Sequence, residues 1–137
     1  MSKESIAHIE EQSPYEMSIS VQGNQEILHI KHRDWKENQT FDSHFPIGGV
    51  QLFDMETRQP KEFVKTEEIE NLYKRFLDEG ASYHALVQMH GLRSLIDFFK
   101  MPAERQKAML EVLNAGSSKK DAEMYANMPE QERKKYL

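Results

Sequence analysis

The feature that most constrains this 137-residue chain is an alternation of apolar and polar residues over positions 15–21. Apolar side chains at every second position are typical of a strand with one buried face. Gly23 and Asn24 follow as a two-residue turn, and such a short turn sets the pairing of the two strands that it joins. The resulting pairs are Ile19 with Leu28, Met17 with Ile30, Tyr15 with His32, and Glu16 with Lys31. We therefore expect a β-hairpin, with the first of these pairs facing the core.

The stretch from residue 33 to residue 65 is interrupted by prolines and glycines, yet it also holds several aromatic residues. A structureless loop of this length is uncommon inside a small domain. Residues 50–54 and 61–64 have the composition of two further strands. The sequence thus predicts that the hairpin is extended into a small antiparallel sheet.

After residue 65 the apolar spacing changes to that of amphipathic helices. A first helix is predicted over 67–79, with Thr66 as its N-cap. The segment 82–99 is apolar around most of a helical wheel, which predicts the most buried helix. Within it, Gly91 either admits a close neighbour or breaks the helix in two.

Two more helices are predicted over 103–115 and 119–126, and a last turn or two after Pro129. The order of elements predicts an α+β fold with four or five helices in its C-terminal half. We expect one domain, 1–137, made of an N-terminal arm over residues 1–14, a β-rich part over 15–65 and a helical part over 66–137.

Composition narrows the classes of function. The chain has no cysteine, which excludes disulfides and cysteine-based zinc sites. No apolar stretch approaches the roughly 20 residues that cross a bilayer, and the first residues lack a secretory signal pattern. These observations predict a cytoplasmic protein without membrane association. The net charge of −5 predicts little more than solubility.

Four residues have the chemistry of metal ligands: His29, His32, Asp42 and His44. In the predicted strand, His29 and His32 are three positions apart, which directs their side chains to opposite faces. We therefore predict no metal and no cofactor. A His/Asp metal-dependent enzyme is the third hypothesis for function.

A second polar group, His90, Arg93 and Asp97, lies on one stripe of the predicted helix over 82–99. A general base beside an anion-binding arginine has this pattern, and so has the solvated edge of a buried helix. No nucleophile is visibly paired with the group. The sequence consequently indicates no catalytic residue, and a non-enzyme is the favoured class.

Residues 113–137 outline a helix-turn-helix, but Glu130 and Glu132 lie in the segment that would read DNA and would repel phosphates. A DNA-associated regulator that uses the C-terminal helices is therefore the second hypothesis.

The first hypothesis is a small cytoplasmic accessory protein that binds another protein, as an adaptor or inhibitor, and has no catalytic activity of its own. The C-terminal segment is short and charged, and it needs apolar contacts from the same chain, a second copy or a partner. The residues expected to bind a protein are Met124, Tyr125, Met128, Tyr136 and Trp35.

Overall fold

The computed structural model describes residues 13–136, which form two compact units, residues 13–47 and residues 48–136. The boundary falls inside the part of the chain that we expected to be β-rich. The predicted organisation as a single domain stays a prediction. Nearly all of the predicted N-terminal arm, residues 1–14, lies outside the described residues.

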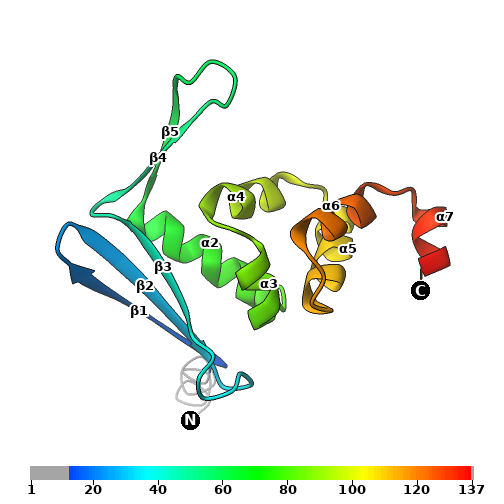
Figure 1. Cartoon of the computed structure of the whole chain (residues 1–137), viewed down its shortest axis with the longest axis horizontal. Helices are drawn as coiled ribbons and strands as arrows, with labels where there is room; N and C mark the ends of the chain where they lie inside the picture. The colour runs from blue at the N-terminus through cyan, green and yellow to red at the C-terminus, as the bar shows by residue number, and fades with distance from the viewer. Residues whose placement is uncertain (1–12, 137) are drawn as a thin grey trace, which may run out of the picture. The chain divides into compact units, whose positions relative to one another are not determined.

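The first unit is a three-stranded antiparallel sheet in the order β1-β2-β3 (Figure 1). Its strands are β1 (Tyr15–Gln22), β2 (Gln25–His32) and β3 (Phe41–Pro46). β1 and β2 pair in the register that the two-residue turn predicts, with Ile19 opposite Leu28 and Glu16 opposite Lys31. The hairpin prediction is confirmed, because the turn and the apolar alternation specify the same pairing.

The two residues of the predicted core pair, Ile19 and Leu28, differ in burial. Leu28 is fully buried, whereas Ile19 is 37% exposed. β1 is at the edge of the sheet, so its side chains have neighbours on one side within the described sheet. Ile27, on the face that we expected to be polar, is also buried. The expectation that Ile19 faces the core is therefore only partly met.

β3 is the strand that extends the hairpin, and the sequence analysis did not single it out. It pairs with β2 from Gln25 opposite Pro46 to Ile30 opposite Phe41. Its aromatic residues, Phe41 and Phe45, lie on the face of the sheet that carries Leu28. Polar residues separate Phe41 from Phe45, so the apolar alternation in β3 is short. For this reason propensity alone did not identify the strand.

The second unit begins with a separate two-stranded antiparallel sheet, β4 (Gly49–Phe53) and β5 (Pro60–Lys65). Both strands were predicted, but the expectation that they extend the first hairpin was wrong. In their connection, the Asp54 carboxylate accepts hydrogen bonds from the backbone N–H groups of Thr57 (2.9 Å) and Glu56 (2.8 Å). These bonds lower the pKa of Asp54, because they stabilise its charged form.

Gly49 should be essential to the pairing of β4 with β5. Its φ of +142° disfavours any side chain, and a Cβ there would overlap the backbone carbonyl oxygen of Val64. We expect Gly49→Ala to lower the free energy of unfolding by about 2–4 kcal/mol. Gly48→Ala is the matched control, because Gly48 also has a positive φ but has open space around the Cβ position, and should cost about 1 kcal/mol. Urea unfolding of both variants measures the difference, and equal losses would contradict the steric argument.

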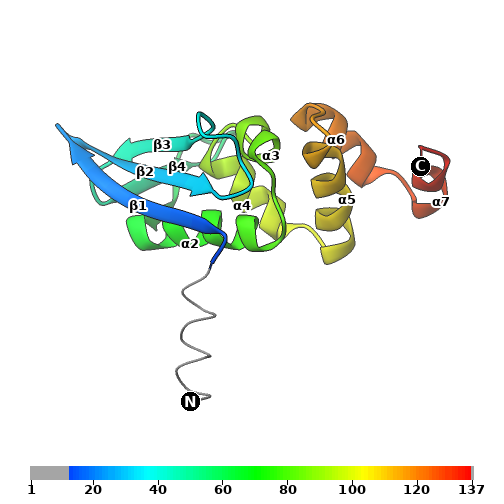
Figure 2. The same ribbon diagram turned by 90° about the horizontal axis from the view of Figure 1, so that it is seen from below.

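Six α-helices follow within the described residues, and all of them lie in the second unit (Figures 1 and 2). They are α2 (Thr66–Asp78), α3 (Tyr83–Gln88), α4 (Leu92–Lys100), α5 (Ala103–Asn114), α6 (Lys119–Asn127) and α7 (Glu130–Arg133), followed by a 3-10 turn, η1 (Lys134–Tyr136). α2 packs on β4, β5 and α4, while α5 packs on α3 and α6. The α+β class is confirmed. None of the described helices combines the length and apolar character needed to cross a bilayer.

The predicted helix over 82–99 is two helices, α3 and α4. His90 and Gly91 both have positive φ, at 54° and 108°, and two such residues in succession end a right-handed helix. Of the two alternatives for Gly91, the break is the one found, and it raises the number of helices above four or five. The N-cap of α2 is Lys65, not Thr66 as expected, and no side-chain bond caps this helix.

Candidate functional site

α6 and the residue that ends it, Met128, hold three of the five residues that we expected to bind a protein. Ser118 caps α6, where its hydroxyl oxygen accepts a hydrogen bond from the backbone N–H of Asp121 at 3.2 Å. Ala122 and Ala126 lie four residues apart and are fully buried. Because alanines admit close packing, α6 meets α5 through this stripe, and Figures 1 and 2 both show the two helices side by side. The helix therefore docks within its own chain.

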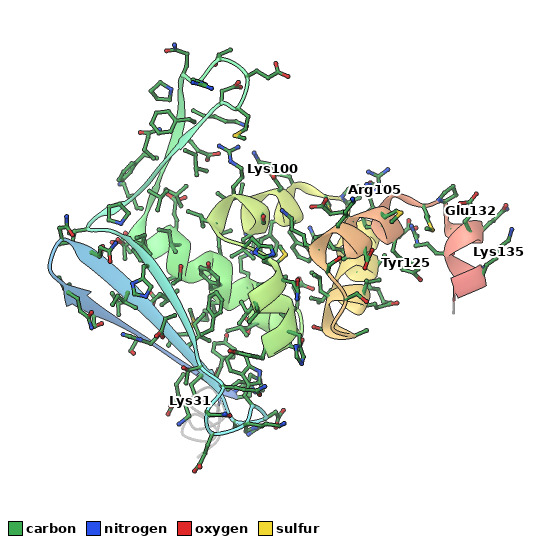
Figure 3. All side chains as sticks on the ribbon, viewed as in Figure 1. Lys31, Lys100, Arg105, Tyr125, Glu132 and Lys135 are labelled. Carbon is green, nitrogen blue, oxygen red and sulfur yellow. The ribbon has the colours of Figure 1, made fainter. Side chains whose placement is uncertain are left out.

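The same geometry leaves the larger apolar residues of α6 accessible. Met124 is 54% exposed, and Tyr125 and Met128 are half-buried. Figure 3 labels Tyr125 on α6. An isolated exposed methionine is common on protein surfaces, but three neighbouring apolar side chains form a continuous patch. The packing of α6 on α5 does not use up this patch.

A groove runs along the patch, with a volume of about 440 Å³. Its lining residues are Glu111, Val112, Ala115, Ser117, Asp121, Met124, Tyr125 and Met128. The apolar members come from both helices, and both charged members carry carboxylates. The groove therefore combines an apolar floor with negative charge, which suits an apolar segment that also carries positive charge.

Arg133 holds the end of the chain beside these helices. Its guanidinium donates hydrogen bonds to the backbone carbonyl oxygens of Met128 (2.6 Å) and Ala126 (3.4 Å), and it forms an ion pair with Glu104 of α5. The carbonyls at the end of α6 lack partners within the helix, so the arginine satisfies groups that would otherwise need water. This anchor ties the residues after α6 to Glu104 on α5.

The five residues expected to bind a protein are only partly brought together. Met124, Tyr125 and Met128 line one groove, whereas Trp35 lies in the first unit. There its ring stacks on that of His32 at 5.6 Å, and His32 in turn stacks on Tyr15 at 6.5 Å. The side chain of Tyr136 lies outside the described residues.

The group expected from His90, Arg93 and Asp97 does not lie on one helical stripe. His90 is in the break between α3 and α4, so it does not share the helical register of the other two. Arg93 donates a hydrogen bond to the backbone carbonyl oxygen of Phe53, which ties α4 to the end of β4. This contact gives the arginine a structural partner. The expectation that His90, Arg93 and Asp97 share one helical stripe was therefore wrong.

The histidines of the first unit are arranged as their spacing predicts, with His29 and His32 on opposite faces of β2. His29 Nδ1 lies 2.8 Å from Asp42 Oδ1, across the β2–β3 pair. His29 Nε2 lies 2.8 Å from the hydroxyl oxygen of Ser20, across the β1–β2 pair. The three side chains thus form a continuous chain of hydrogen bonds over three strands.

Metal-binding geometry is a separate question from this chain of bonds. Among residues 13–136, no group of three His, Asp or Glu residues is arranged to hold a metal ion. His44 lies on the same face as His29 and Asp42, but it pairs with Ile27 in the register. The predicted absence of a metal and of a cofactor stays a prediction.

Similarity offers no guide to this site. Comparisons with family models, with curated proteins and with solved structures find no match to the chain. The function must therefore be argued from the residues and their contacts.

The sequence analysis missed two sets of residues. Glu111 and Val112 of the groove lie on a helix that was correctly predicted, but nothing in the pattern indicates which of its faces meets α6. Ser20 was missed although the hairpin register places it on the same face as His29, one diagonal step away. The missing information was the position of Asp42, which depends on β3.

Proposed function

We propose that this protein is a small adaptor or inhibitor that captures another protein through the groove between α5 and α6. The observation that carries the proposal is that α6 has two different faces. Its alanines are buried against α5, while Met124 remains 54% exposed above a groove lined by both helices. Methionine side chains are flexible and polarizable, so they adapt to apolar partners of different shape.

The chemistry of the groove favours a basic amphipathic helix as the partner. A groove between two packed helices accepts the apolar face of a third helix, which inserts side chains spaced three or four residues apart. Glu111 and Asp121 then favour lysine or arginine at the edges of that face. The net charge of −5 on the whole chain acts in the same direction during association.

Two observations favour a protein over DNA as the partner. α7 has four residues, which is short for a helix that reads the major groove. Arg133 is buried and paired with Glu104, so this cation is engaged within the chain. A DNA-associated role is therefore the weaker proposal, and cytoplasmic location remains an expectation.

The test compares two methionine variants of the full chain. We expect Met124→Asp to weaken binding of the partner at least tenfold, about 1.4 kcal/mol, because it places a charge in the apolar groove. Met55→Asp, on the exposed turn between β4 and β5, should bind like the wild type. Partners are captured from a cell extract with all three proteins, identified by mass, and the affinity of the bound segment is then measured by calorimetry.

The two methionine positions also distinguish the alternatives. Loss of the partner in both variants, or only in Met55→Asp, would contradict the assignment to the groove. A basic partner should further bind more weakly as ionic strength rises, because salt screens Glu111 and Asp121. Retention of the partner by Met124→Asp would show that the groove is not the docking site.

A further inference from the structure

The first unit carries an arrangement that the binding role does not use, the hydrogen-bonded chain of Ser20, His29 and Asp42. A carboxylate can only accept hydrogen bonds, so His29 Nδ1 donates to Asp42 Oδ1. In the neutral imidazole Nε2 is then unprotonated, and it accepts the hydrogen bond of the Ser20 hydroxyl at 2.8 Å. Nucleophile, base and orienting carboxylate therefore lie in the order and at the separations that nucleophilic catalysis requires.

These side chains are accessible from solvent. The side chains of His29 and Asp42 are 37% and 45% exposed, and Ser20 is half-buried. They come from three neighbouring strands, so the sheet fixes their separation more firmly than a loop would. The site is thus both preorganised and open to a small reagent.

The edge position of β1 adds backbone donors beside Ser20. Arg33 N–H donates to the carbonyl of Pro14, which makes even-numbered residues of β1 the hydrogen-bonded members of the β1–β2 ladder. The N–H groups of Ile19 and Val21 are then directed to the outer edge, where no described strand pairs with β1. On an extended strand these two N–H groups lie about 6.7 Å apart, so a developing oxyanion beside Ser20 takes a hydrogen bond from one of them.

We propose that Ser20 is an activated nucleophile that takes the acyl group of small carboxylic esters. In the first step the Ser20 oxygen bonds to the ester carbonyl carbon while His29 Nε2 takes the hydroxyl proton. The bond from that carbon to the alkoxy oxygen then breaks, and the leaving alcohol receives the proton from His29. Water hydrolyses the acyl-serine by the same sequence of steps, which releases the carboxylic acid and restores Ser20. Asp42 acts as a positioning residue that holds the imidazole tautomer.

The test uses two probes on the full chain, a fluorophosphonate and p-nitrophenyl acetate. We expect the fluorophosphonate to add once, at Ser20, as located by peptide mass mapping, and p-nitrophenyl acetate to release its chromophore catalytically. Ser20→Ala should abolish the labelling and reduce release to the background of the remaining chain. Ser18→Ala is the matched control, because Ser18 lies on the same face of the same strand. This variant should react like the wild type, because the hydroxyl that bonds His29 Nε2 is that of Ser20.

Two further variants separate catalysis from a purely structural chain of hydrogen bonds. His29→Gln should slow labelling by roughly 100-fold, the usual contribution of a general base. Asp42→Asn should also slow it, and nitrogen NMR of the imidazole should show His29 leaving the Nδ1–H tautomer, a change that loss of stability alone would not produce. Melting temperatures close to the wild type confirm that the variants remain folded. Equal reaction of wild type and Ser20→Ala with both probes would overturn the proposal.

Discussion

Leu28→Asp is expected to unfold the sheet of the first unit. Leu28 is fully buried on the central strand β2, so the change removes about 2–5 kcal/mol of apolar burial and also places a carboxylate without a partner in an apolar environment. The sum is comparable to the whole stability of a small domain, about 5–15 kcal/mol. The fluorescence of Trp35, the only tryptophan of the chain, reports on this unit and should resemble that of the unfolded protein.

Ile19→Asp is the matched control, because Ile19 lies directly opposite Leu28 in the same register. If both members of the pair faced the core, as the sequence predicts, the two substitutions would lower the free energy of unfolding equally. With Ile19 37% exposed, its aspartate keeps contact with water and should cost only about 1 kcal/mol. Equal urea midpoints for the two variants would show that β1 and β2 contribute alike to the core, contrary to the structure.

Phe98→Ala should produce the largest loss of stability in the second unit. Phe98 of α4 is fully buried, and its ring meets that of Phe76 of α2 edge to face at a centroid distance of 5.1 Å. Truncation of a buried phenylalanine to alanine costs about 3–5 kcal/mol, because it leaves a cavity that the surrounding side chains fill only partly. Urea unfolding followed by far-UV circular dichroism measures this loss through the helices.

Phe53→Ala provides the comparison for this measurement. Phe53 is 48% exposed on β4, so its removal should cost less than about 1 kcal/mol. Phe98→Leu keeps most of the apolar volume and should fall between the two alanine variants. If Phe98→Ala and Phe53→Ala unfold at the same urea concentration, the contact between α2 and α4 is not central to the stability of this unit.

Local signals in the sequence determined much of the secondary structure. The two-residue turn at Gly23 and Asn24 specified every pair of the β1–β2 register, because such a turn leaves one arrangement of the strands that it joins. The start of α6 is local for a similar reason, since the Ser118 side chain bonds a backbone N–H only three residues away. These features involve residues close together in the chain.

Only the tertiary structure decided which surfaces meet. Whether the alanines or the methionines of α6 face α5 depends on the helix that α6 packs against, and a helical wheel of α6 contains no information about its neighbour. Asp42 reaches His29 only because β3 pairs with β2 across a connection of eight residues. Both candidate sites are therefore products of long-range packing: the sequence determined most of the elements and the register of the first hairpin, and the tertiary structure brought the side chains of each site together.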